Sequence, residues 1–156
     1  MAREIERKFL VMDDSWKKNV SHSVHIIQAY LANTERGSIR IRISGERAQL
    51  NIKSMTLGIS RTEYDYPIPL DDARHLIRDF CMQPSIEKQR HYLDVGGHTW
   101  EIDVFEKENS GLIVAEIELG DPDEAFIKPG WAGIEVSDDP RYYNVSLVEN
   151  PFRDWI

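Results

Sequence analysis

Ionisable residues two positions apart recur along this sequence of 156 residues. The first group is Glu4, Glu6 and Lys8, within the segment Glu4-Ile5-Glu6-Arg7-Lys8. In a β-strand alternate side chains share a face, so these three groups would stand in a row about 6.5 Å apart. One such row is typical of an ordinary solvated strand face. Its repetition in later segments indicates a site.

The same spacing returns in six further segments. They are Arg40-x-Arg42, Asn51-x-Lys53, Arg61-x-Glu63-x-Asp65, Lys88-x-Arg90, Glu101-x-Asp103 and Glu116-x-Glu118. Arginine forks suit phosphate oxygens, and clustered carboxylates suit hard divalent cations. On one shared surface the carboxylates would outnumber the cations by one, and two Mg²⁺ ions would approach neutrality with a triphosphate of about four negative charges. These residue types predict metal-assisted phosphoryl transfer.

The segments that carry these residues are predicted strands, because apolar residues alternate with the charged ones. Residues 38–44 give the clearest pattern, with isoleucines on one face and two arginines on the other. The predicted strands are 4–9, 25–31, 38–44, 48–53, 61–66, 86–93, 99–105 and 112–119. Gly96-Gly97 is a hairpin turn, residues 54–60 form a loop, and Pro67 and Pro69 end the strand before them.

The predicted helices are few. The longest begins at Asp71-Asp72 and presents an apolar face of Ala73, Leu76, Ile77 and Phe80. A short helix or turn follows Asp13, and Asp121-Pro122 begins another short helix through Phe126. Residues 130–133 are irregular. A terminal helix runs from Asp139-Pro140 to Asn150-Pro151 and carries Tyr143, Leu147 and Val148.

Strands joined by short turns predict a mainly β (α+β) fold, an eight-stranded antiparallel β-sheet or barrel with helices packed outside. The strongly apolar strand faces would be covered by the amphipathic helices. The charged faces would then look at each other across the interior of a closed sheet, which has room for one small ligand. No repeat, low-complexity tract or linker is present, so we expect residues 1–156 to form a single domain.

Composition narrows the classes of partner. A net charge of −8 argues against a nucleic-acid partner, because such binding demands a basic surface. No apolar run approaches the length of a membrane span, so we expect no membrane partner and a cytoplasmic location. The single cysteine, Cys81, agrees with a reducing compartment and is expected to be a packed, inert thiol. The five histidines match no metal-ligand spacing.

The charged segments, taken in order, are similar to those of a known family. Glu4-Ile5-Glu6-Arg7-Lys8-Phe9-Leu10-Val11, followed by the six segments above, resembles the CYTH superfamily, also called triphosphate tunnel metalloenzymes. The resemblance covers nearly the whole chain, including residues 139–144. It implies a closed eight-stranded tunnel that binds triphosphates with a divalent metal, and a C-terminal helix that plugs one mouth.

The resemblance also implies roles for individual residues. The first implied metal ligands are Glu4, Glu6 and Glu118. Three more carboxylates complete the set or hold a second ion: Glu63, Asp103 and Glu116. The ions would be Mg²⁺ or Mn²⁺, two with substrate bound. The implied phosphate-binding residues are Lys8, Arg40, Arg42, Lys53, Arg61, Lys88 and Arg90. Glu6, Lys8 and Lys88 are the catalytic candidates, and either lysine could orient or deprotonate the attacking water. Asp65 stands where a second glutamate is common, so its direct contact with metal is in doubt.

The leading expectation is hydrolysis of inorganic tripolyphosphate to pyrophosphate and phosphate. The alternatives are a class IV-type adenylate cyclase and a phosphohydrolase of thiamine triphosphate or a nucleoside triphosphate. A non-catalytic polyphosphate or nucleotide binder would not need every candidate carboxylate, and a lipid carrier would need apolar residues on the charged faces. Aromatic residues such as Trp131 and Trp155 could serve a homodimer.

Overall fold

The fold is built mainly from β-strands. Within residues 3–55 and 58–155, which the computed structural model describes, the chain forms nine strands and two α-helices. The strands are β1 (Arg3–Val11), β2 (His22–Thr34), β3 (Gly37–Ser44), β4 (Arg47–Ser54), β5 (Ser60–Ile68), β6 (Ile86–Val95), β7 (His98–Phe105), β8 (Ile113–Glu118) and β9 (Ala132–Glu135). The α-helices are α1 (Leu70–Asp79) and α2 (Asn144–Glu149), and short 3₁₀ helices lie at Ser15–Asn19, Lys107–Asn109, Pro140–Tyr142 and Phe152–Asp154.

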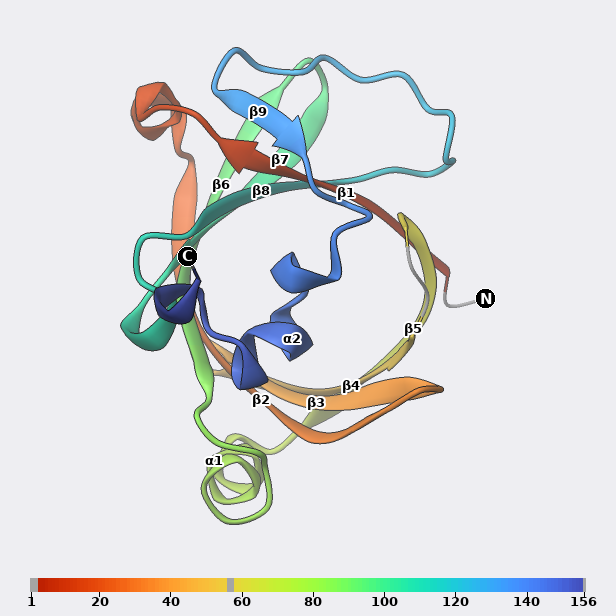
Figure 1. The fold of residues 1–156 in the computed structure, drawn as a ribbon, viewed down its shortest axis with the longest axis vertical. Coiled ribbons are helices and arrows are strands. Elements are labelled where there is room, and N and C mark those ends of the chain that lie inside the picture. The colour runs from red at the N-terminus through yellow and green to blue at the C-terminus, as the bar shows by residue number, and fades with distance from the viewer. Residues whose placement is uncertain (1–2, 56–57, 156) are drawn as a thin grey trace.

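Eight of the strands close into an antiparallel barrel, as predicted. The sheet order is β5-β4-β3-β2-β6-β7-β8-β1-β9, and an additional pairing of β5 with β1 completes the ring (Figure 1). β9 adds to the outside of this ring along β1. The pairing that closes the ring is short and consists of Arg3, Glu4 and Ile5 opposite residues 60–62. By contrast, β6 and β7 pair along eight positions.

The alternation of the sequence decides which side chains face the interior. Lys88 and Arg90 lie on one face of β6, and this face looks inward because both residues line the cavity. The strand β6 pairs with β2 on one side and with β7 on the other. On β1, Glu6 lies opposite Glu118 of β8, and Lys8 lies opposite Glu116. Directly opposed residues share a face, so the charged pairs of neighbouring strands form one continuous lining.

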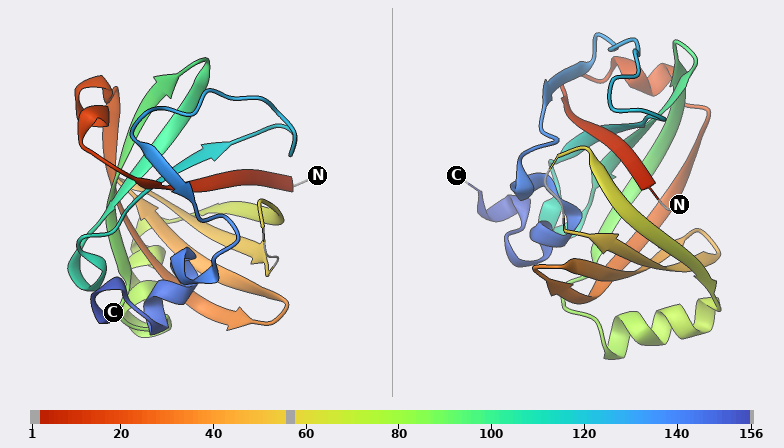
Figure 2. Two further views of the ribbon diagram at one scale, coloured as in Figure 1. Left: turned by 45° about the horizontal axis from the view of Figure 1, so that its top comes forward. Right: turned by 90° about the vertical axis from the view of Figure 1, so that its right-hand side faces the viewer.

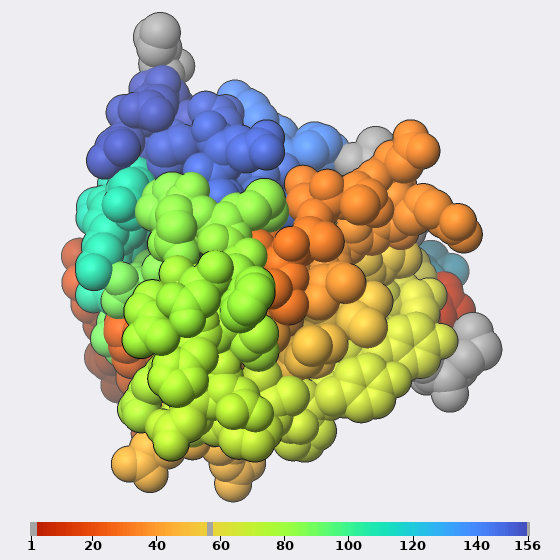
Figure 3. Space-filling view, turned by 90° about the horizontal axis from the view of Figure 1, so that it is seen from below, coloured from red at the N-terminus to blue at the C-terminus, as the bar shows by residue number. Residues whose placement is uncertain are grey.

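Outside the barrel, α1 covers only part of the apolar surface. Its Ala73, Leu76 and Ile77 pack against a cluster from β2, β3 and β4 that includes Ala29 and Ile41. In the view from below, α1 lies over these strands (Figure 3). Its amphipathic stripe is therefore confirmed.

Phe80, which the sequence placed on that stripe, is 70% exposed. The helix ends at Asp79, and Phe80 has the non-helical angles φ −124° and ψ −21°. Its side chain consequently leaves the line of the helix face, and the prediction for this residue was wrong.

A second cluster is covered by a strand and a loop where helices were expected. Ile5, Phe9, Trp100 and Ile117 belong to this cluster, which residues 126–132 help to cover. Residues 130 and 131 are irregular as predicted, but 132 and 133 belong to β9, so the prediction was wrong for those two residues. The pairing of β9 with the outer part of β1 supplies the order that its short sequence does not signal.

The helix predicted from Asp121 to Phe126 is only a turn. The Glu124 amide donates to the Asp121 carbonyl, and the Asp123 amide donates to the Asp121 carboxylate. Phe126 then packs against Phe9 and Trp100, with ring centroids 6.1 and 5.9 Å away. Burial of this ring requires an extended chain after the turn, which is why the helix does not continue.

β5 also runs further than predicted, through Pro67 to Ile68. β1 pairs with β5 only at residues 60–62, so the part around Pro67 has β4 as its only neighbour among the described strands. A proline, which lacks an amide hydrogen, is tolerated where a strand has one free edge. Thr56 and Leu57, in the predicted loop, lie outside the described residues.

The terminal segment enters one end of the barrel (Figures 1 and 2). The predicted single helix is divided at Tyr143 into a 3₁₀ turn and α2. Val145, Leu147 and Val148 are buried in a cluster with Ile86 and Phe105 at that end. Tyr143 and Leu147 carry the predicted buried positions, while α2 fills the barrel mouth with apolar side chains. Among the described residues, no helix is long and apolar enough to cross a membrane.

Candidate active site

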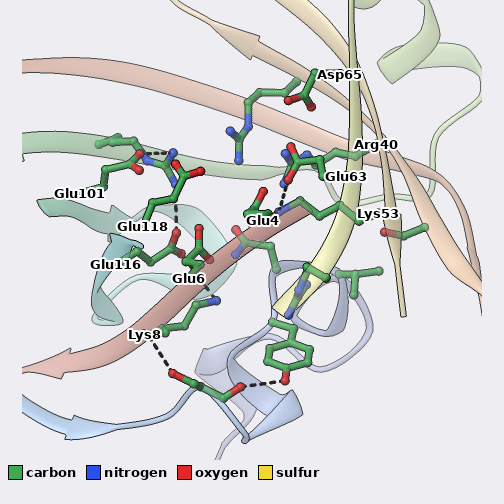
Figure 4. Close-up of a pocket in the computed structure, with 18 of the residues that line it drawn as sticks. Glu4, Glu6, Lys8, Arg40, Lys53, Glu63, Asp65, Glu101, Glu116 and Glu118 are labelled. Atoms are coloured by element: carbon green, nitrogen blue, oxygen red, sulfur yellow. Dashed lines mark hydrogen bonds and ion pairs between the residues drawn. The ribbon is translucent and has the colours of Figure 1, made fainter. Parts of the chain in front are cut away.

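The barrel interior contains a charged cavity of about 230 Å³. The cavity is lined by thirteen of the charged residues on the predicted faces: Glu4, Glu6, Lys8, Arg40, Arg42, Lys53, Arg61, Glu63, Lys88, Arg90, Glu101, Glu116 and Glu118. Asp65 joins them, and Tyr143, Asn144 and Val145 close the end at α2. Figure 4 shows carboxylates and cations from several strands pointing toward one another. The closure of the sheet has brought together groups that lie up to 114 positions apart, from Glu4 to Glu118.

One wall is acidic. Glu6 of β1 faces Glu116 and Glu118 of β8 (Figure 4). Burial, reinforced by the charge of Glu116, raises the pKa of Glu6 to about 8. Burial raises the pKa of Glu118 as well, whereas cations led by Lys8 outweigh burial and hold the pKa of Glu116 below its usual value. The wall therefore concentrates more negative charge than the neighbouring cations neutralise.

Lys53 joins carboxylates from two other strands. Its Nζ lies 3.3 Å from Glu4 Oε1 and 3.2 Å from Glu63 Oε2. Burial lowers the pKa of Lys53 to about 8. The Oε2 atom of Glu63 is buried and accepts no hydrogen bond among the described residues. Lys53 thus offsets part of the negative charge of Glu63, but Glu63 Oε2 is left without a hydrogen-bond donor.

Asp103 lies behind the cavity and holds two cations. Its carboxylate accepts two hydrogen bonds from Arg90, at 2.8 and 2.9 Å, and lies 2.8 Å from Lys88 Nζ. Asp103 and Lys88 are both fully buried. The two cations outweigh the effect of burial and lower the pKa of Asp103 to about 2. Asp103 is not among the lining residues, so the structure does not bring it to the other predicted metal ligands.

Burial lowers the pKa of Lys88 to about 7, although Asp103 opposes this shift. Arg90 differs, because Asp103, Glu101 and Glu116 outweigh the effect of burial and raise its pKa. Arg90 therefore stays charged, while Lys88 can gain or lose a proton near neutral pH.

Two side-chain amides hold the arginines of β3. Arg40 Nε donates to Asn51 Oδ1 at 3.0 Å, and Asn51 in turn donates to Asp65. Arg42 Nε donates to Gln28 Oε1 at 3.0 Å. Burial lowers the pKa of Arg42 to about 9, which leaves it charged at neutral pH. Asp65 thus lines the cavity and also accepts a hydrogen bond from the amide that holds Arg40.

The end of the cavity at α2 contains functional groups that the spacing pattern did not reveal. Tyr143 Oη donates to the Ser137 carbonyl at 2.8 Å, and the Arg61 guanidinium lies 4.9 Å from the Tyr143 ring centroid. Lys8 Nζ donates to the Tyr142 carbonyl at 3.2 Å. These contacts join the terminal segment to cations of β1 and β5. Of the side-chain amides that hold the arginines, only Asn51 had a signal in the sequence, which was its spacing of two positions from Lys53.

The donor set suits a hard divalent cation. Oxygen ligands from several carboxylates are the kind that Mg²⁺ and Mn²⁺ prefer. The raised pKa of Glu6 and the unsatisfied Oε2 of Glu63 mark places where a cation would relieve crowded negative charge. In the described parts of the chain, no three such ligands are already grouped as one metal site, because Lys53 and Lys8 contact some of these carboxylates.

Comparisons with known proteins agree with this geometry. A model of the CYTH domain matches residues 2–145. An inorganic triphosphatase of Acetivibrio thermocellus is 42% identical over 155 residues, which are 99% of each chain. An inorganic triphosphatase of Nitrosomonas europaea is 34% identical over 149 residues, covering 93% of this chain and 96% of that protein. A crystal structure of an inorganic triphosphatase, 33% identical, superposes with a TM-score of 0.68 and covers 95% of both chains.

Proposed function

Because this chain belongs to the CYTH domain family, we propose that it is a metal-dependent phosphohydrolase that cleaves inorganic tripolyphosphate to pyrophosphate and phosphate. The observation that carries this choice is the cavity. Its volume of about 230 Å³ lies below the roughly 300–1,000 Å³ typical of pockets for drug-sized ligands. Fourteen of its 21 lining residues are charged, so it offers cations to phosphate oxygens and little apolar surface to an organic group.

Five carboxylates would hold the metal: Glu4, Glu6, Glu63, Glu116 and Glu118. We place Asp103 outside this set, since its oxygens contact Arg90 and Lys88. The family implies a divalent metal, and we propose Mg²⁺ or Mn²⁺, with two ions when substrate is bound. Divalent ions supply charge neutralisation on phosphate oxygens and activation of water for attack.

The cations of the lining would bind and orient the phosphates. Arg40, Arg42 and Arg90 all line the cavity. An amide oxygen accepts from Nε of Arg40 and of Arg42 and leaves their other guanidinium nitrogens for a ligand, whereas Arg90 is held by Asp103 and Glu101. A guanidinium fork fits phosphate oxygens with two parallel hydrogen bonds. Positioning and charge neutralisation provide most of the rate in phosphoryl transfer, so held arginines are the expected apparatus.

Lys88 is our choice for the group that orients the attacking water or accepts its proton. Its lowered pKa of about 7 allows a neutral amine to be present at physiological pH. Lys8 lies 3.6 Å from Glu116 and donates to the Tyr142 carbonyl, contacts that favour phosphate binding for this residue. Lys88→Met is expected to lower kcat by at least 100-fold, whereas Lys8→Met should mainly raise KM.

A substrate panel tests the proposal. Tripolyphosphate, thiamine triphosphate, ATP and pyrophosphate are incubated with Mg²⁺ or Mn²⁺, and both phosphate release and cyclic AMP are measured. We expect phosphate release chiefly from tripolyphosphate. Cyclic AMP from ATP, without hydrolysis of tripolyphosphate, would show a cyclase instead. Binding without turnover of any compound would show a non-catalytic polyphosphate binder.

The metal assignment has its own test. Glu6→Gln is nearly isosteric and should reduce activity to near background, because it removes a ligand charge from the acidic wall. Glu46→Gln, in the exposed turn between β3 and β4, is the matched control and should be fully active. Full activity of both Glu4→Gln and Glu6→Gln would exclude them as metal ligands.

The homodimer and the cytoplasmic location stay predictions.

A further inference from the structure

The side-chain amides of Gln28 and Asn144 are held in one orientation by donors that cannot accept. Arg42 Nε donates at 3.0 Å to the Gln28 oxygen, so the Gln28 nitrogen faces the other way. That nitrogen donates at 2.7 Å to Asn144 Oδ1. Lys88 Nζ lies 2.9 Å from the same oxygen and donates to it as well. Two independent donors therefore require Asn144 to present its oxygen to them.

This orientation leaves the Asn144 nitrogen as a donor with nothing to bind inside the protein. Asn144 Nδ2 donates no hydrogen bond among the described residues, while Gln28 and Lys88 occupy the oxygen side of the group. The atom is also not one of the buried unsatisfied nitrogens of the described chain. Because Asn144 lines the cavity, Nδ2 is open to the space within it.

The neighbours of Asn144 determine what this donor would meet. Asn144 shares the closed end of the cavity with Lys8, Lys88 and Arg61. The carboxylates in contact with these lysines are Glu116 and Asp103, so the cations are in excess and this end favours an anionic ligand. Val145, Leu147 and Val148 are buried in the apolar cluster that fills the barrel mouth behind it. An anion that reaches this end therefore stops against the amide.

We propose that Asn144 binds the substrate at the closed end of the cavity, where its Nδ2 donates to an oxygen of the phosphate group lying beside Lys88. This inference rests on the proposed function, since it takes tripolyphosphate as the anion. It makes α2 part of the binding site as well as a seal, because the helix supplies a hydrogen bond that only a correctly placed terminal phosphate receives.

Two substitutions separate donation from mere support. Asn144→Asp keeps an oxygen for Lys88 and Gln28 but replaces the donor, and Asn144→Ala removes both functions without adding charge. Ser146→Ala, on the same helix and outside the cavity lining, is the control. Binding of tripolyphosphate is measured by titration calorimetry in metal-free buffer with a chelator, so that the readout does not depend on turnover. Both Asn144 variants should bind about 10- to 100-fold more weakly, and Ser146→Ala should bind like the wild type.

The outcomes distinguish this inference from the function on which it rests. If the wild type fails to bind or hydrolyse tripolyphosphate, both fail. If the wild type does both and Asn144→Asp or Asn144→Ala binds as tightly, only the role of Asn144 is overturned. A crystal structure of the wild type with tripolyphosphate checks the contact directly. A phosphate oxygen should lie about 2.7–3.2 Å from Nδ2, and a complex without one rejects the proposal.

Discussion

At the scale of single residues, Asp103 holds two cations where solvent does not reach. Lys88 and Arg90 would carry a large desolvation cost without it, since burial disfavours their charged forms. The carboxylate keeps one cation fixed and leaves the other with a lowered pKa. Asp103 thus holds Lys88 and Arg90 at the cavity wall without lining the cavity itself.

Asp103→Asn should destabilise the fold by about 3–5 kcal/mol, because it leaves buried cations beside a neutral amide. Urea unfolding followed by circular dichroism measures the loss. Asp72→Asn, at an exposed position of α1, is the matched control and should change stability by less than about 0.5 kcal/mol. A cost for Asp103→Asn as small as that of the control would contradict the structural role assigned to this carboxylate.

Glu6 gives a prediction about pH. Its pKa is about 8 in the folded protein and near 4.5 when unfolded, so between these values the folded state binds more protons. Stability contributed by this group therefore falls as pH rises across that range. The lowered pKa values of Lys88 and Lys53, about 7 and about 8, act with opposite sign above those values. Between about pH 5 and 7 both lysines are largely protonated, but the pKa values of Glu118 and Glu101 are also raised. The contribution of Glu6 is therefore measured as a difference between the wild type and a Glu6 variant, which share these other groups.

In metal-free buffer, Glu6→Gln should gain stability relative to the wild type as pH rises from about 5 to 7. Thermal unfolding at several pH values measures the difference in Tm between the two proteins. Glu46→Gln, at an exposed turn, should track the wild type throughout. A constant difference between Glu6→Gln and the wild type would show that Glu6 ionises normally in the folded protein.

Sequence spacing predicted the residues of the site better than their partners. Strand alternation places Glu6 and Lys8 on one face of β1, and the strongly apolar opposite faces of the strands indicate that the charged faces look inward. It does not determine which carboxylate pairs with which cation, since that depends on sheet order and register. Asp103 illustrates the limit, because its place opposite Arg90 on β6 makes it a structural partner, although its spacing matches that of a ligand.

At the scale of elements, seven of the eight predicted strands were found because each carries its own alternation, and β2 was found from its apolar residues. β9 has four residues and gains its order from β1, which no local pattern expresses. The turn at Asp121 has the start signal of a helix, but burial of Phe126 decides against one. The elements that the sequence missed are thus those fixed by tertiary contacts.

The element that closes the cavity offers a stability test. Leu147 of α2 is fully buried in the barrel mouth, so Leu147→Ala should cost about 2–5 kcal/mol. Glu149→Ala, on the exposed side of the same helix, should cost less than about 0.5 kcal/mol. Chemical denaturation measures both. Equal effects of the two substitutions would mean that α2 does not pack in the mouth as described.

At the scale of the whole molecule, the barrel is closed by its shortest pairing. β1 meets β5 at three positions, continued by the Glu6 amide, which donates to the Ile59 carbonyl at 2.8 Å. β7, in contrast, is paired along its length with β6 and β8. Fewer backbone pairings give a lower free energy of local opening, so the seam between β1 and β5 is the expected place for the ring to open.

The site lies across that seam, which links ligand binding to closure. Glu4 is on β1, Glu63 is on β5, and Lys53 of β4 contacts both. A ligand that binds residues on both sides stabilises the closed ring, because an open ring loses those contacts.

Without ligand, the Glu6 amide should exchange its hydrogen faster than the amides of β7. Tripolyphosphate with Mg²⁺ should slow exchange at Glu6 more than in β7, as measured by hydrogen exchange with NMR detection. Sulfate at matched ionic strength controls for salt, and equal slowing in both regions would show that the ligand stabilises the fold without acting through the seam.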